Sequence, residues 1–160
     1  MKKEMIQKMK TYKLKNMKKY LLIFALLLGA VSSWGQTVAD QAAVLQKIID
    51  LPDLQQYYPK GPDQNPEQVY VVQLPYAFQA NIQLMKFGKP VKFLDSAKPL
   101  DKMTVAYFQF ESLTFSGNTA TAKFVFYYTL IRTQASFLGT VVLNKTGENW
   151  IITDTKLNGR

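Results

Sequence analysis

Residues 119–131 read TATAKFVFYYTLI, and this stretch decides the fold. Every second position from 120 to 130 carries Ala, Phe, Tyr or Leu, whereas the positions between them carry mainly Thr and Lys. Because successive side chains of a strand point to opposite faces of a sheet, this alternation predicts a central strand with one apolar face. The residues expected on its core face are Ala120, Ala122, Phe124, Phe126, Tyr128 and Leu130.

The flanking segments predict three more strands, which together make a four-stranded antiparallel meander. Turn signals separate the strands: SGN precedes the central strand and TGE lies between the last two. On the final strand Trp150 and Ile152 face together, and continued alternation places Asp154 on the same face. The three predicted strands are Thr104–Phe115, Ser136–Lys145 and Asn149–Leu157.

The first strand of the meander does not keep its phase. Phe108 and Phe110 fall on one face, whereas Leu113 and Phe115 fall on the other. A β-bulge near Glu111–Ser112 would bring all four to the same face, because it adds one residue to the strand and bends it. We therefore expect a strongly bent sheet.

An amphipathic helix is expected before the sheet, over Thr37–Leu51. Its apolar residues recur at spacings of three and four, and Thr37 or Asp40 is suited to cap its start. Pro52 ends it, since a residue that precedes proline is disfavoured in the helical conformation. Asp53–Tyr58 predicts a further short helical turn.

The segment between the helix and the meander is less regular. Val69–Leu74 predicts a strand that ends at Pro75. Residues 76–87 fit either a helix or an alternating strand, and we favour the strand, paired with Val91–Leu94 across a turn at Gly88. Five lysines between residues 86 and 102 make a local basic cluster, which we interpret as solvated surface: Lys86, Lys89, Lys92, Lys98 and Lys102.

The N-terminus has the pattern of a secretory signal peptide. Eight of the 20 basic residues precede one apolar run, Tyr20–Val31, which a small-residue segment follows. We predict a signal over residues 1–35, with Met17 as an alternative start, and a single domain over residues 36–160. The protein is then exported to a bacterial periplasm or exterior.

The composition excludes several classes of function. From Gln36 onward there are 12 basic and 10 acidic residues, and this net charge of +2 does not favour nucleic acid or a membrane as a partner. The chain has no Cys and no His, so disulfides, the usual general base and the commonest metal ligand are missing. Asp63, Asn65 and Glu67 follow part of a calcium-loop rhythm, but Pro66 interrupts it. We predict no cofactor and no metal.

Two segments of the meander carry a resemblance to a known family: GNTATA at residues 117–122 and LNKTGENWII at residues 143–152. With the preceding helix, the meander resembles the nuclear transport factor 2-like superfamily. The resemblance implies an α+β fold, in which an N-terminal helix packs on a strongly bent antiparallel sheet to form a cone. A cystatin-like arrangement is the nearest alternative.

In the resembled family the cone encloses a cavity that some members use for isomerase or dehydratase chemistry. An Asp–His pair is impossible here, which leaves Asp154 and Glu111 as candidate acids, with Tyr107 or Tyr128 as hydroxyl donor. The aromatic residues would either fill the core or line an apolar pocket. The candidate ligand-binding residues are Phe108, Phe110, Phe126, Tyr128 and Trp150.

Three functions from different classes follow. The first is a non-enzymatic exported domain that binds a small apolar or amphipathic ligand, or a partner protein. The second is a structural homodimer through the outer sheet face, which carries Val125, Tyr127 and Ile131. The third, which we favour least, is an isomerase-type cavity enzyme that uses Asp154 and a tyrosine.

Overall fold

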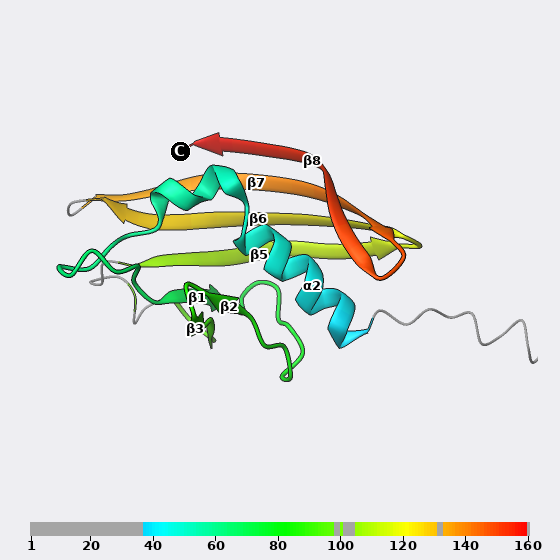
Figure 1. Cartoon of the computed structure of the whole chain (residues 1–160), viewed down its shortest axis with the longest axis horizontal. Coiled ribbons are helices and arrows are strands. Elements are labelled where there is room, and N and C mark those ends of the chain that lie inside the picture. The colour runs from blue at the N-terminus through cyan, green and yellow to red at the C-terminus, as the bar shows by residue number, and fades with distance from the viewer. Residues whose placement is uncertain (1–36, 98–99, 101–104, 131–132, 160) are drawn as a thin grey trace, which may run out of the picture. The chain divides into compact units, whose positions relative to one another are not determined.

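One helix and a six-stranded sheet dominate the computed structural model, which describes residues 37–97, 100, 105–130 and 133–159. The predicted signal segment lies outside these residues. The α+β class is confirmed, and the sheet is mostly antiparallel (Figure 1). In chain order the elements are α2 (Val38–Ile49), η2 (Pro52–Tyr57), β1 (Val69–Val72), β2 (Met85–Lys86), β3 (Lys89–Pro90), β4 (Lys92–Leu94), β5 (Ala106–Ser116), β6 (Thr119–Leu130), β7 (Thr133–Thr146) and β8 (Asn149–Gly159).

The main sheet has the strand order β4-β1-β5-β6-β7-β8. Strands β5 to β8 form the predicted antiparallel meander, with turns at Gly117 and Gly147, both of which have positive φ. The short strand β1 adds to the meander in parallel with β5, and β4 adds in parallel with β1. β2 and β3 form a separate two-stranded hairpin.

The helix prediction is confirmed. Thr37 caps α2, and its hydroxyl accepts a hydrogen bond from the Asp40 backbone N–H. Pro52 begins the 3-10 helix η2, so the short turn predicted after the helix also exists. The buried face of α2, which includes Leu45 and Ile48, packs on the same core as the sheet. No helix in the part of the chain that the structure describes is long and apolar enough to cross a membrane.

The central strand is β6, as predicted. Ala120, Ala122, Phe124 and Phe126 are fully buried, and Tyr128 is buried as well; the side chain of Leu130 lies outside the described ones. Phe124 faces Gly139 on β7, where the missing side chain leaves room for the ring. Burial of such a Phe side chain contributes on the order of 2–3 kcal/mol to the stability of the fold.

The bulge predicted in β5 is confirmed. Phe110 pairs with Phe124 and Ser112 pairs with Lys123, which leaves Glu111 without an opposite residue on β6. The insertion returns Leu113 to the core face, where it is buried.

A second bulge, in β8, was not predicted, and it corrects the expected place of Asp154. Ile152 pairs with Leu143, but Asp154 pairs with Val142, so Thr153 is the extra residue. The alternation shifts by one at this point, and Asp154 leaves the face shared by Trp150 and Ile152. β8 changes direction along its length (Figure 1).

The strand favoured within residues 76–87 was wrong for most of that segment. Residues 78–84 form no strand or helix, and the turn at Gly88 joins only the two-residue strands β2 and β3. Phe78, Ile82 and Leu84 are nevertheless buried. Three separate anchors in the core therefore hold this segment in place of a hydrogen-bonded ladder.

The sheet buries residues on both faces. A second cluster lies on the face opposite α2, and Tyr127 packs against it with its ring stacked on Tyr107 at 4.7 Å between centroids. Val125 is only 6% exposed, and Ile131 lies outside the described residues. Two of the three residues named for a dimer interface, Val125 and Tyr127, are therefore buried or partly buried within the chain itself. The buried residues of this cluster are Tyr70, Val72, Leu100, Val105 and Tyr107.

Candidate functional site

The aromatic residues predicted to bind a ligand lie in the core. Phe108, Phe110 and Phe126 have no exposed surface, and Trp150 and Tyr128 are 3% and 7% exposed. The rings pack on one another, with 4.8 Å between the centroids of Phe108 and Phe126 and 5.7 Å between those of Phe126 and Tyr128. These contacts fill the space under α2 with side chains of the chain itself.

The acids and hydroxyls considered for catalysis do not converge. Asp154 and Glu111 are exposed. Tyr128 lies on the core face of β6, and burial raises its pKa above the ordinary value. Tyr107 lies in the opposite cluster, where its hydroxyl accepts a hydrogen bond of 3.1 Å from the Gln134 side chain. Asp154 and Tyr107 both lie off the core face, but they are far apart along the sheet. Asp154 pairs with Val142, whereas Tyr107 is in register with Ser136 through Tyr127, six residues away along β7.

A carboxylate that the sequence indicated only as a helix cap lies beside Trp150. Asp40 Oδ1 accepts hydrogen bonds from Lys145 Nζ at 2.6 Å and from Trp150 Nε1 at 3.0 Å. The hydrogen bond from Lys145 is the main cause that holds the pKa of Asp40 below its usual value, and burial acts in the opposite direction. The cluster fixes the first turn of α2 on the β7–β8 hairpin.

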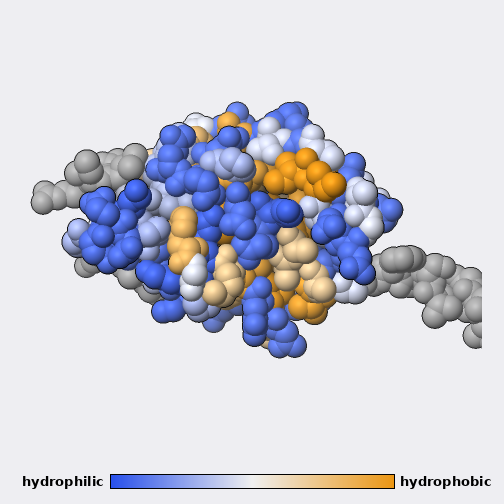
Figure 2. Space-filling model, viewed as in Figure 1, coloured by the Kyte–Doolittle hydropathy of each residue, from blue (hydrophilic) through white to orange (hydrophobic). Residues whose placement is uncertain are grey.

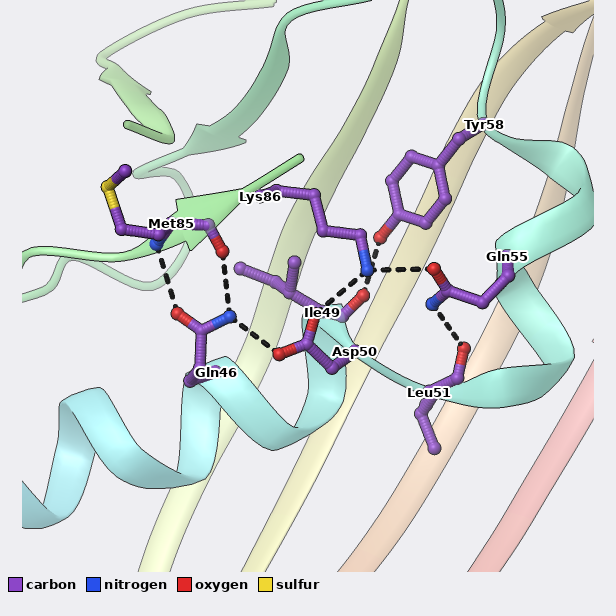
Figure 3. A network of polar contacts seen from close by, with 8 residues as sticks. All are labelled: Gln46, Ile49, Asp50, Leu51, Gln55, Tyr58, Met85 and Lys86. Atoms are coloured by element: carbon purple, nitrogen blue, oxygen red, sulfur yellow. Dashed lines mark hydrogen bonds and ion pairs between the residues drawn. The ribbon is translucent and has the colours of Figure 1, made fainter. Parts of the chain in front are cut away.

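The sequence interpretation also placed Lys86 wrongly. It was expected to be solvated, but it is only 7% exposed. Its Nζ lies 2.8 Å from Asp50 Oδ1 and donates to Gln55 Oε1 at 2.8 Å (Figure 3). The ammonium also lies 5.0 Å from the ring centroid of Tyr58 and 4.8 Å from that of Phe87. A buried charge is tolerated when it is paired in this way.

The backbone of the hairpin is held by a second side chain from α2. Gln46 Nε2 donates to the Met85 carbonyl at 2.8 Å, and the Met85 N–H donates to Gln46 Oε1 at 3.0 Å. Gln46 thereby satisfies both backbone groups of Met85, as a neighbouring strand would (Figure 3). The same amide donates to Asp50 Oδ2 at 2.7 Å, which joins it to the ion pair.

The end of α2 completes this network. The Tyr58 hydroxyl donates to the Ile49 carbonyl at 2.7 Å, and the Gln55 amide donates to the Leu51 carbonyl at 2.8 Å. Carbonyls at a helix C-terminus have no partner within the helix, and a positive charge such as that of Lys86 is favourable there. Burial is the main cause that raises the pKa of Tyr58, and the charge of Asp50 adds to it.

The anchored hairpin presents apolar side chains to solvent. Met85 is 51% exposed and Phe87 is 38% exposed, on either side of the buried Lys86. Phe87 and Gly88 form the turn with φ of 52° and 74°, the signs of a type I′ turn. Glycine and asparagine favour this conformation, whereas a bulky residue is strained in it. Strain of this kind persists where the surroundings enforce it, and it concentrates at functional sites.

We define the hairpin site as Met85, Lys86, Phe87 and Gly88 with their anchors on α2 and η2. The alternation of buried residues at Ile82 and Leu84 was the one signal in the sequence that could have placed Lys86 inside. Comparisons with family models, curated proteins and solved structures find no match for this chain. Its function is therefore inferred from geometry alone.

Proposed function

We propose that this chain is an exported, non-enzymatic domain that binds a partner protein through the hairpin site. It would be a member of the nuclear transport factor 2-like superfamily, with a strongly bent sheet. The two bulges, in β5 and β8, support the bend, since a bulge increases the local curvature of a strand.

The observation that carries the proposed function is the exposure of Met85 and Phe87 on a hairpin that is firmly held. Because the backbone of the hairpin is already held in place, it loses little conformational entropy on binding. Aromatic and methionine side chains are also enriched at the centres of protein interfaces. Asn would suit the turn better than Phe, and Phe87 stays 38% exposed although its ring contacts Tyr58 and Lys86.

A partner protein is favoured over a small apolar ligand by where the apolar surface lies. The rings under α2 contact one another, so the apolar side chains that remain accessible are on the outside. Among the described residues the exposed large hydrophobic side chains are Leu74, Met85, Phe87 and Ile151, of which two are neighbours on the hairpin. Figure 2 shows hydrophobic areas interspersed among hydrophilic residues on the face that carries α2.

Site-specific photocrosslinking tests the proposed function. A photoreactive phenylalanine analogue at position 87 is expected to give one discrete protein adduct in the cells that make the chain. The matched control carries the same analogue at position 151, because Ile151 is as exposed as Met85, at 51%. Failure to form an adduct at 87, or the same adducts at both positions, would contradict a binding role for the hairpin.

A further inference from the structure

The last strand of the main sheet has an edge that no other described strand occupies. β8 spans 11 residues and pairs with β7 along one side. Figure 1 shows it at the margin of the sheet, with no described element beyond it. The backbone N–H and C=O groups along such an edge are available to another strand.

The part of β8 after the bulge is regular. From Asp154 to Gly159 its pairing with β7 continues without a shift, from Val142 to Phe137. The bulge at Thr153 bends the strand, so a partner strand can follow β8 only on one side of the bend. Asp154 and Lys156 lie two residues apart on the same face of this segment, and both are exposed.

We propose that two copies of this chain associate by pairing β8 with β8 antiparallel, about a two-fold axis at Thr155. In this register Asp154 of each copy faces Lys156 of the other. Residues directly opposite each other on antiparallel strands have neighbouring side chains, so the two pairs attract. The neighbouring registers are disfavoured, because an axis at Asp154 sets the two aspartates against each other and an axis at Lys156 does the same for the lysines.

A second copy of the chain fits the free edge of β8 better than an unrelated strand, because the charges of Asp154 and Lys156 on this edge complement each other between two copies. A two-fold axis brings the same residues of both copies together, so one acidic and one basic residue form both pairs. Assembly stops at two copies, because the contact occupies the free edge of β8 in each of them. It leaves the hairpin site on β2–β3 unused, so dimer formation and the proposed function can fail independently.

Charge reversal in the protein from Gln36 onward tests the dimer. We expect sedimentation velocity over a range of concentrations to show a monomer–dimer equilibrium that weakens as salt is added. Asp154→Lys alone, or Lys156→Glu alone, places like charges opposite each other twice in the dimer, so the dissociation constant should rise about tenfold. The double variant D154K/K156E restores both pairs and should return the constant to about the wild-type value.

Lys123→Glu is a matched control for Lys156→Glu, because it replaces a lysine by a glutamate at an exposed position of the interior strand β6. It should leave the dissociation constant unchanged. A strict monomer at all concentrations overturns the proposed pairing. So does a dimer that tolerates both single variants, or one that the double variant fails to restore. Circular dichroism of each variant confirms that the fold is intact.

Discussion

The centre of the sheet and the β2–β3 hairpin are both held against α2, but by opposite means. The centre uses rings that have no exposed surface, such as Phe108 and Phe124, and each ring contacts several others. The hairpin uses one buried ammonium, Lys86, and two side-chain amides, Gln46 and Gln55. A core of rings distributes its stability over many contacts, whereas the hairpin depends on a few polar groups that must all be present.

The largest loss in the free energy of unfolding is expected for a substitution at the centre of the sheet. Phe124→Ala removes a ring that packs at 5.6 Å from both Phe108 and Phe110, measured between centroids, and should lower the free energy of unfolding by about 3–5 kcal/mol. Urea denaturation monitored by circular dichroism measures it. A loss below about 1 kcal/mol would mean that the site collapses around the cavity or that the ring is not in the core.

A substitution in the hairpin should lower the free energy of unfolding less than Phe124→Ala does, but it should increase local opening of the hairpin more. Lys86→Ala removes the ion pair and the ring contacts, and we expect a loss of about 2 kcal/mol. The loss is smaller than for a fully buried pair because the Asp50 side chain is 48% exposed and can be solvated. Hydrogen exchange should show a faster Met85 amide, since that N–H bonds to Gln46 in the same network.

Lys89→Ala is the matched control for Lys86→Ala. Lys89 lies on the same hairpin, but it is exposed, and its ammonium donates to the Pro66 carbonyl. Its removal should change the free energy of unfolding by less than about 0.5 kcal/mol. Equal effects of the two variants would show that the buried ammonium does not anchor the hairpin.

The difference between the centre of the sheet and the hairpin also explains which features the sequence could predict. The strands around β6 are long and alternate regularly, so the faces of Phe124 and Phe126 follow from spacing alone. The slip between Phe110 and Leu113 was visible because large apolar residues stand on both sides of the bulge. In β8 the residues directly after the bulge are polar, and Leu157, at an odd position beyond Ile152, was the one apolar sign of a shift.

The region around the hairpin could not be predicted in this way. Its strands are two residues long, and residues 78–84 are held by separate anchors, so no period extends far enough to be recognised. Lys86 was interpreted as solvated because lysine is almost never buried without a partner. Its partners Asp50 and Gln55 lie more than 30 residues earlier in the chain, and only the tertiary fold brings them together.

Asp40, which binds Lys145 and Trp150, is a further anchor of α2, and its titration should make the stability of the fold depend on pH. Because the pKa of Asp40 is lowered in the folded protein, its charged form stabilises the fold at any pH above the ordinary carboxyl value of 3.8. This stability is lost as the pH falls below that value through the lowered pKa. Asp40→Asn should cost about 1 kcal/mol at pH 7 and should flatten the dependence of stability on pH in this acidic range. An unchanged dependence would exclude Asp40 as its source.

The smallest expected effect, at Phe87, is the most informative because two contributions compete there. Phe87→Asn relieves a positive φ that costs on the order of 1–3 kcal/mol. The change also removes two contacts of the ring. The contact with Tyr58, at 5.2 Å between centroids, contributes about 0.5–1.5 kcal/mol. The contact with the Lys86 ammonium, at 4.8 Å from the ring centroid, contributes about 0.5–1 kcal/mol. We therefore expect a small net gain, below about 0.5 kcal/mol, in the free energy of unfolding.

Phe87→Ala separates the two contributions, because alanine loses the ring without suiting the turn. It should destabilise the protein by about 1 kcal/mol, so the two variants should differ in sign. Both should abolish binding of the partner protein that crosslinking at position 87 identifies, since both remove the exposed ring. If Phe87→Asn is more stable than the wild type and still binds, the strained ring serves neither the fold nor the interface. If it is more stable and binding is lost, the strain is maintained for the interface, at a cost to the fold.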